Sequence, residues 1–142
     1  MFSQELYKKL LALTVISVWI LLILQLFAME FHLYWIFKWF DILMHGIGGI
    51  AVGFFMSALL VRFKPMLVSH YGLFILIVAT GTVFVGLLWE SLELLLDLYM
   101  RVPLHQPSVT DTIIDLVMDG VGAYIAGVLG VIIVKKYESI TK

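Results

Sequence analysis

The sequence contains no cysteine and few charged residues. The absence of cysteine from all 142 residues excludes disulfides, thiolate metal ligands and a cysteine nucleophile. Charged residues make up only 13% of the chain, whereas 63% of the residues are hydrophobic. The formal net charge of −1 offers no basic face for nucleic acid. A soluble domain of this size could not bury so much apolar surface, so the composition predicts an integral membrane protein in contact with membrane lipids.

Long apolar stretches account for most of the chain. Four of them stand out, at about residues 10–29, 42–61, 71–96 and 112–134. Each is close to or above the roughly 20 residues that a helix needs to cross a hydrocarbon core of about 30 Å. Backbone polar groups in lipid must be paired internally, so these stretches predict helices. We therefore expect an all-α integral membrane protein with four transmembrane helices in a single domain, residues 1–142.

Basic residues are distributed unevenly around these stretches. Seven of the nine lie at the two termini and between the second and third stretches, namely Lys8, Lys9, Arg62, Lys64, Lys135, Lys136 and Lys142. The first and third connections carry one each, Lys38 and Arg101. By the positive-inside rule, both termini are expected to be cytoplasmic and these two connections to face outward.

Polar and small residues recur at helical spacing inside three of the predicted spans. The members are Asp41, His45, Gly49 and Gly53 in the second span, Thr82, Gly86, Glu90, Glu93 and Asp97 in the third, and Asp111, Asp115 and Asp119 in the fourth. Intervals of three or four residues place each set on one face of its helix. In each span the ionisable groups lie in one half and small residues in the other.

The expected topology brings the ionisable halves of the three helices together. The second and fourth spans begin at the outer face and the third ends there, so their acidic parts share the outer half of the membrane. The residues predicted to meet are Asp41, His45, Glu90, Glu93, Asp115 and Asp119. Small residues in the inner halves would let the backbones approach closely. We therefore expect a polar pocket between the second, third and fourth spans, open to the outer side.

The carboxylates of this predicted pocket have few cationic partners. No lysine or arginine lies within the four apolar stretches, and only Arg101 and His105 in the third connection could fold over the acids. A charge at the bilayer centre costs about 2.5–3.5 kcal/mol. Three interpretations follow: protonated carboxylates, a wet pocket, or a bound cation. Oxygen ligands with at most one imidazole suit Mg²⁺, Ca²⁺ or Mn²⁺ better than zinc, so a divalent cation is the candidate cofactor.

The ordered motifs of the three spans resemble a known superfamily. The motifs are Asp-x-x-x-His from Asp41, Trp-Glu-x-x-Glu from Trp89 and Asp-Thr-x-x-Asp-x-x-x-Asp-x-x-Gly-Ala from Asp111. Together they resemble the VanZ-like superfamily of small membrane proteins, closest to its uncharacterised YjdF-type branch. The VanZ pattern tends to carry Gln in place of Glu93 and Asn in place of Asp119, so its glycopeptide-resistance role is not transferred. The resemblance implies a multi-pass protein of the cytoplasmic (cell) membrane of a bacterium or archaeon.

Three classes of function are compatible with these residues. The first is an enzyme acting on lipid or lipid-linked phosphate at the outer leaflet, with a divalent cation held by the carboxylates and His45, Glu90 and Asp115 as catalytic residues. Against it, phosphate sites usually carry basic clamps, and only Arg101 is available. The second is a proton- or cation-coupled transport or binding protein, for which four helices would need a homodimer. The third is a non-catalytic assembly or resistance factor.

Structural roles compete with these functions at several positions. Asp111 suits the first turn of a helix, where an acid interacts favourably with the helix dipole. Asp97 suits an interfacial position near the end of the third span. His45 and Glu90 could instead pair with each other to fix the register of two helices. The sequence leaves these alternatives open.

Overall fold

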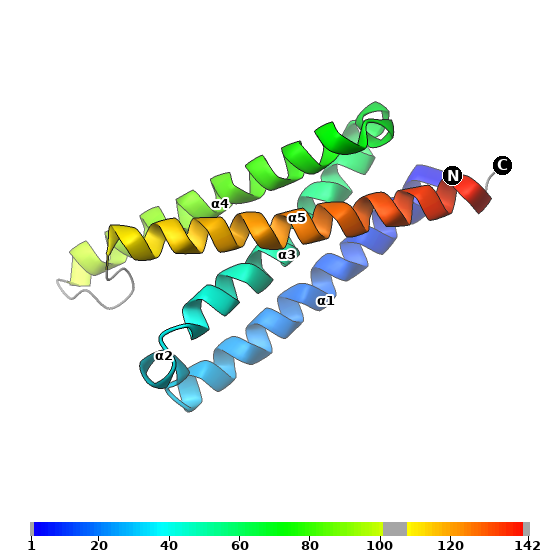
Figure 1. The fold of residues 1–142 in the computed structure, drawn as a ribbon. Helices are drawn as coiled ribbons and strands as arrows, with labels where there is room; N and C mark the ends of the chain where they lie inside the picture. The colour runs from blue at the N-terminus through cyan, green and yellow to red at the C-terminus, as the bar shows by residue number, and fades with distance from the viewer. Residues whose placement is uncertain (1, 101–107, 141–142) are drawn as a thin grey trace.

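The computed structural model describes residues 2–100 and 108–140, and all the secondary structure in these residues is helical. The chain has four long helices, with a short helix between the first two and a 3₁₀ turn between the second and third (Figure 1). The elements are α1 (Phe2–Glu30), α2 (Leu33–Ile36), α3 (Phe40–Phe63), η1 (Pro65–Ser69), α4 (Tyr71–Met100) and α5 (Val109–Ile140).

The prediction of four transmembrane helices is confirmed at the level of length and composition. The helices that are long and apolar enough to cross a membrane cover Gln4–Glu30, Phe40–Phe63, Tyr71–Met100 and Val109–Tyr137. Three of them begin before the apolar stretches that were recognised in the sequence, and all four end after them. They do so because each helix continues through polar residues at its ends, which satisfy their backbone hydrogen bonds within the same helix.

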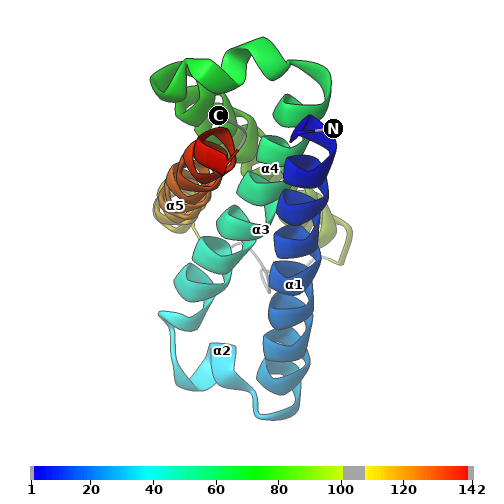
Figure 2. The same ribbon diagram turned by 90° about the vertical axis from the view of Figure 1, so that its right-hand side faces the viewer.

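Helix α3 lies at the centre of the bundle. It packs against α1, α5 and α4, and α5 also packs along α4. Figures 1 and 2 show both termini at one end of the bundle and α2 at the opposite end. We call these the terminal end and the α2 end. Whether the terminal end faces the cytoplasm, as the basic residues predict, stays a prediction.

The terminal end contains the main apolar core. All four long helices contribute fully buried side chains, including Leu6, Leu10, Val61, Phe74, Val78 and Val134. Because lipid is as apolar as these side chains, their contribution to stability comes from close packing rather than from removal from water.

Glycines allow α3 and α5 to cross with their backbones in contact. A Cβ atom added at Gly49 would overlap the carbonyl oxygen of Asp119 and lie 2.9 Å from its Cα atom. A Cβ atom at Gly122 would overlap the carbonyl oxygen of Gly46. This close approach includes Asp119 itself. Small residues therefore permit close packing in the acidic part of the bundle as well as toward the terminal end, where we expected it.

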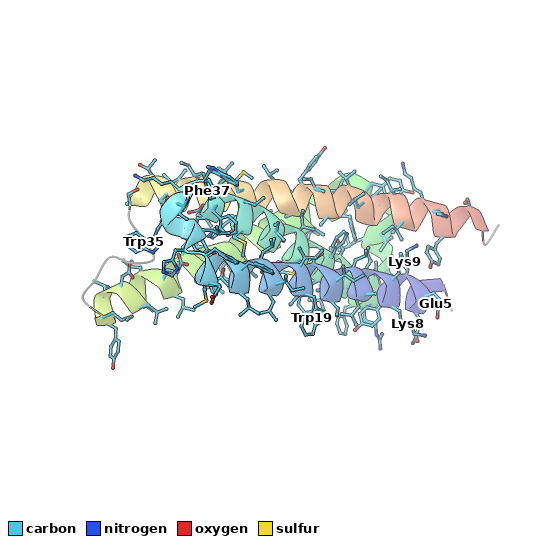
Figure 3. The ribbon with its side chains drawn as sticks, turned by 90° about the horizontal axis from the view of Figure 1, so that it is seen from below. Glu5, Lys8, Lys9, Trp19, Trp35 and Phe37 are labelled. Atoms are coloured by element: carbon cyan, nitrogen blue, oxygen red, sulfur yellow. The ribbon has the colours of Figure 1, made fainter. Side chains whose placement is uncertain are left out.

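Aromatic side chains surround the α2 end. Figure 3 labels Trp35 and Phe37 there, whereas Lys8 and Lys9 lie near the opposite end of α1. The Trp35 side chain is 80% exposed. Exposed tryptophans at the end of a spanning helix are typical of the membrane–water interface.

Candidate functional site

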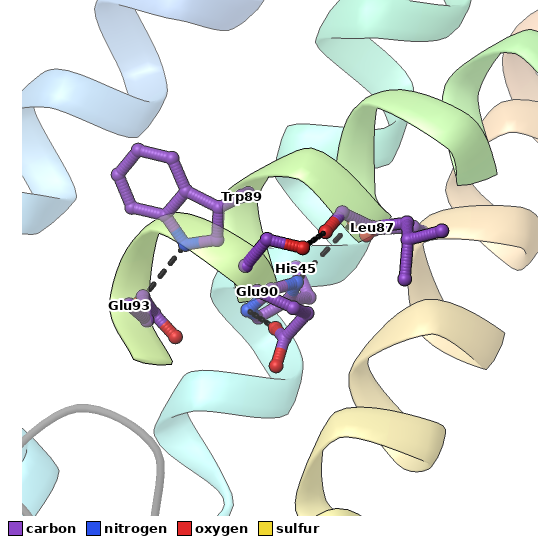
Figure 4. A network of polar contacts seen from close by, with 7 residues as sticks. His45, Leu87, Trp89, Glu90 and Glu93 are labelled. Atoms are coloured by element: carbon purple, nitrogen blue, oxygen red, sulfur yellow. Dashed lines mark hydrogen bonds and ion pairs between the residues drawn. The ribbon is translucent and has the colours of Figure 1, made fainter. Parts of the chain in front are cut away.

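His45 lies between two carboxylates from two other helices. Its Nε2 atom is 3.5 Å from Oε1 of Glu90 on α4, and its Nδ1 atom is 3.4 Å from Oδ1 of Asp119 on α5. Figure 4 shows the contact with Glu90. All three side chains are buried. Both distances exceed the roughly 2.7–2.9 Å of a charge-assisted hydrogen bond.

A second group shares His45 and has the spacing of a metal site. One ligand atom from each of Asp41, His45 and Asp115 lies within 4.8 Å of the other two. Asp41 is one turn before His45 on α3, and Asp115 is one turn before Asp119 on α5. Two oxygen ligands on opposite sides of a Mg²⁺ or Ca²⁺ ion are separated by about 4–5 Å. One ion could therefore contact all three residues after small side-chain movements.

Two buried carboxylate oxygens at this site lack a hydrogen-bond partner within the described part of the chain. They are Oδ1 of Asp115 and Oδ2 of Asp119. The two side chains are only 2% and 6% exposed, respectively. Buried polar atoms in proteins are nearly always paired with protein, water or an ion. The two oxygens therefore point to a proton, a water molecule or a cation at each position.

The position of the Asp119 carboxylate depends on a glycine in the neighbouring helix. A Cβ atom added at Gly86 of α4 would overlap Oδ2 of Asp119 and lie 3.2 Å from Cδ2 of Leu116. The Asp119 side chain thus fills the space that any larger residue at position 86 would occupy. Gly86 lies one turn before Glu90, so the same face of α4 both accommodates Asp119 and supplies a partner for His45.

The structure places four of the six predicted site residues around a fifth, His45, and Glu93 lies at the edge of the group. Oε1 of Glu93 accepts a hydrogen bond of 2.9 Å from the indole nitrogen of Trp89, as Figure 4 shows. Glu93 is half-buried, in contrast to Glu90. A catalytic or metal-binding role for any of these residues stays a prediction.

One interpretation from the sequence stays a prediction, and one lies outside the described residues. Asp97, which we expected at the membrane interface, is only 8% exposed because it is on the face of α4 that points into the bundle, and its depth in the membrane stays a prediction. Arg101 and His105, which we considered as cationic partners for the acids, are not among the described residues.

Sequence reasoning missed a polar pair at the α2 end. The hydroxyl of Tyr34 donates a hydrogen bond to Oε1 of Gln25 in α1, and the Tyr34 ring packs edge-on against Phe40 at 5.2 Å. Burial, followed by the negative charge of Asp41, raises the pKa of Tyr34 to about 12. Tyr34 is therefore close enough to sense the acidic site. Gln25 is the only amide in the first apolar stretch, which was the available signal.

The groove that the structure contains between α4 and α5 is apolar. It has a volume of about 590 Å³ and is lined by Val83 and six residues of α5, including Leu116, Gly120 and Tyr124. No acidic residue lines it, so it does not provide the predicted polar pocket. That pocket stays a prediction.

Comparison with known proteins identifies a family but no activity. Residues 4–136 match the family described as "Predicted membrane protein (DUF2238)". This is a YjdF-like family, which agrees with the branch that the motifs resemble, while the wider VanZ-like superfamily stays a resemblance. No curated protein and no solved structure matches the chain. Because the match covers almost the whole sequence, the chain belongs to the DUF2238 family of predicted membrane proteins.

Proposed function

We propose that this protein binds a divalent cation within the membrane and uses it to act on the phosphate of a lipid or lipid-linked substrate. The observation that carries the proposal is the group formed by Asp41, His45 and Asp115, whose ligand atoms lie within 4.8 Å of one another. The buried Oδ1 atom of Asp115 has no hydrogen-bond partner among the described residues, and it is the strongest sign that a ligand belongs there.

The arrangement around His45 supports a defined role for each neighbour. Asp119 faces Nδ1 of the ring and would accept a hydrogen bond from its N–H, which leaves the Nε2 lone pair directed toward Glu90 and the proposed ion. A carboxylate behind a histidine in this way fixes the tautomer and orientation of the ring. Glu90 would then join Asp41 and Asp115 as an oxygen ligand. Asp119 would be a positioning residue.

The composition of this site selects the kind of ion. Three carboxylates and at most one imidazole favour a hard cation, and Mg²⁺, Ca²⁺ and Mn²⁺ are the candidates. Such an ion polarises a phosphoryl oxygen or activates water. His45 would donate or accept a proton through Nε2 when that atom is not a ligand, and the buried setting of Glu90 and Asp115 would keep bulk water away from the reaction.

A second candidate function rests on the flanking of His45 by two acids. An imidazole 3.5 Å from Glu90 and 3.4 Å from Asp119 is a suitable proton carrier inside a membrane. A proton- or cation-coupled transport protein, acting as a homodimer, would use the same residues without needing a resident metal. A non-catalytic assembly or resistance role would need neither the metal nor the proton.

The test is the metal content of purified protein. We would isolate the full chain in mild detergent and measure Mg²⁺, Ca²⁺ and Mn²⁺ per chain by mass spectrometry, with thermal shifts upon adding each ion. Asp115→Asn and Glu90→Gln are the test variants. Asp111→Asn is the matched control, because Asp111 lies one turn before Asp115 in the same helix and outside the group of mutually close ligands.

We expect near-stoichiometric metal or an ion-dependent thermal shift in the wild type and in Asp111→Asn. In folded Asp115→Asn we expect both to be lost, together with any phosphate release from phospholipid or polyprenyl phosphate. Absence of metal and of a thermal shift in the wild type would overturn the cation proposal. Proton uptake that depends on His45 and Glu90 would then favour the transport alternative.

We also propose that both termini face the cytoplasm and that the α2 end faces outward, in a cell membrane. The proposal is supported by the seven basic residues at the termini and near η1. A chain without cysteine allows a clean test. A membrane-impermeant maleimide should label Lys38→Cys in intact cells and Lys64→Cys only after permeabilisation. The reverse pattern would invert the orientation.

A further inference from the structure

Hydroxyl groups in the spanning helices differ in whether they donate a hydrogen bond to the backbone of their own helix. Three of them donate to the carbonyl oxygen four residues earlier, namely Thr14 to Leu10 at 3.0 Å, Ser17 to Leu13 at 2.9 Å and Ser91 to Leu87 at 2.7 Å. This is the usual way for a hydroxyl in a helix to be satisfied. Two buried hydroxyls have no hydrogen-bond partner among the described residues, Oγ of Ser57 and Oγ1 of Thr82. Thr82, which is only 1% exposed, is the one of these two that shares a helix face with Gly86 and Glu90 beside the acidic site.

The unpaired oxygen of Asp119 lies close to the same part of α4. Its Oδ2 atom occupies the space that a Cβ atom on Gly86 would fill, and Gly86 follows Thr82 by one helical turn. Residues at i and i+4 have Cβ atoms about 5–6 Å apart. The Thr82 side chain and Oδ2 of Asp119 therefore lie about one helical turn apart along α4, and no hydrogen bond joins the Thr82 hydroxyl to that oxygen.

A single water molecule can bridge two polar groups that are about one helical turn apart. Two hydrogen bonds of about 2.8 Å in sequence span about 5.6 Å. A buried water needs two to four polar partners, and it usually pairs groups that would otherwise be unsatisfied. Thr82 offers a donor and Asp119 offers an acceptor, so a water that accepts from one and donates to the other would satisfy both.

We infer that one water molecule is bound between Thr82 and Asp119, on the terminal-end side of His45, and that Thr82 positions the Asp119 carboxylate through it. The water holds Oδ2 in the notch above Gly86, which keeps Oδ1 facing Nδ1 of His45. Leu116 lies beside the notch and also lines the apolar groove between α4 and α5. The inference goes beyond the proposed function and does not require a cation.

The surroundings explain why such a water would stay in place. Thr82 and Asp119 are both more than nine-tenths buried, and Asp119 Oδ2 fills the space of a Cβ atom at Gly86, where α4 and α5 approach closely. A water in this position exchanges slowly with the bulk because leaving would strip two buried groups of their partner. Its residence time gives an experimental handle.

The test compares two variants of Thr82 with a matched threonine elsewhere. Thr82→Val keeps the shape of the side chain and removes the hydroxyl, and Thr82→Ser keeps the hydroxyl. Thr14→Val is the control, because Thr14 is also a buried threonine in a spanning helix but bonds its own backbone. All are made in the full chain in detergent. Oxygen-17 relaxation dispersion measures the number of long-lived buried waters, and nitrogen-15 shifts report the ring of His45.

We expect Thr82→Val to lose one long-lived water relative to the wild type and to shift the Nδ1 signal of His45. Thr82→Ser and Thr14→Val should retain the wild-type water number and the wild-type ring signals. Retention of both readouts in Thr82→Val would overturn the inference. A shifted His45 signal without loss of a water would overturn it as well, because the hydroxyl would then bond Asp119 directly.

A measurement on the wild type keeps the inference testable if Thr82→Val does not fold. Transfer of magnetisation from water to the Thr82 methyl group should be observed in perdeuterated, methyl-labelled protein, and it should be absent at Thr14, whose hydroxyl is satisfied by backbone. Absence of transfer at Thr82 would overturn the bound water irrespective of any variant. The readouts concern the water alone, so failure of the cation proposal would leave them unaffected.

Discussion

The two ends of the bundle are buried to a similar degree but by opposite kinds of side chain. At the terminal end, Leu10, Phe74 and Val134 are fully buried in an apolar core. Toward the α2 end, Glu90 and Asp115 are buried almost as completely, at 3% and 2% exposure. The bundle therefore encloses carboxylates as tightly as it encloses hydrocarbon.

The difference separates the residues that stabilise the bundle from the residues that the proposed function requires. Packing of apolar side chains in a membrane gains dispersion energy at no electrostatic cost. Burial of carboxylates costs free energy unless a partner compensates, and apolar residues of the same size would usually be no less stable. Under the proposed function the buried acids serve cation binding at a cost in stability, whereas the apolar core of the terminal end holds the helices in place.

The largest effect is expected where the two regions join, at the crossing of α3 and α5. Gly49→Ala would drive a Cβ atom into the backbone of Asp119, which cannot rotate away. Overpacking of this kind costs up to about 3 kcal/mol and should also separate His45 from Asp119. We expect a reduced free energy of unfolding, measured by circular dichroism in mixed detergent micelles, and weaker cation binding.

The matched control for this substitution is the neighbouring residue in the same helix. A Cβ atom at Gly48 meets nothing within 4 Å, so Gly48→Ala should leave stability unchanged or raise it by up to about 1 kcal/mol through better helix propensity. Equal effects of the two substitutions would mean that α3 and α5 do not cross as described.

A smaller loss is expected from the apolar core alone. Phe74 is 0% exposed, and Phe74→Ala would leave a cavity of roughly 100 Å³, which at about 24 cal/mol per Å³ costs about 2 kcal/mol. Because Phe74 belongs to the terminal end, the affinity for a cation should stay within about twofold of the wild type in the folded variant. Loss of binding at full folding would show that the two ends are coupled.

The third prediction is a gain in the free energy of unfolding rather than a loss. In protein stripped of metal, Asp115→Asn replaces a buried acid with a neutral amide of the same shape and should raise the free energy of unfolding by about 1 kcal/mol. With a saturating divalent cation the order should reverse, because only the wild type gains binding energy. Unfolding curves with and without chelator test both signs. Destabilisation in chelator would instead mean that Asp115 is a structural residue.

The sequence was sufficient to predict the four helices and much of the candidate site. Intervals of four residues put Asp41 and His45 on one face of α3, and the structure uses that face to contact α5. The predicted topology placed the acids of three helices at one end, where the structure has them. These features depend only on helical geometry and on the lengths of the apolar stretches.

Other features depend on packing between helices and could not be predicted. Glu90 and Glu93 are about 60° apart around α4, and only the rotation of the helix decides that Glu90 meets His45 while Glu93 pairs with Trp89. Tyr34 could not be assigned to Gln25 either, because the pairing needs the turn at His32, which adopts a left-handed conformation with φ of 54°.

The smallest expected effect concerns this pairing of Tyr34 with Gln25, which lies beside the acidic site and belongs to neither packed region. Tyr34→Phe removes the hydrogen bond and should lower the free energy of unfolding by about 0.5–1 kcal/mol at neutral pH, whereas Tyr99→Phe, at an 87% exposed residue, should change it little.

Burial raises the pKa of Tyr34 from 10.0 to about 12, so its neutral form is favoured in the folded state. That contribution is complete below pH 10 and is lost as the pH rises toward 12. The wild type should therefore lose more stability than Tyr34→Phe between pH 9 and 12, and parallel curves would mean that folding does not raise the pKa of Tyr34.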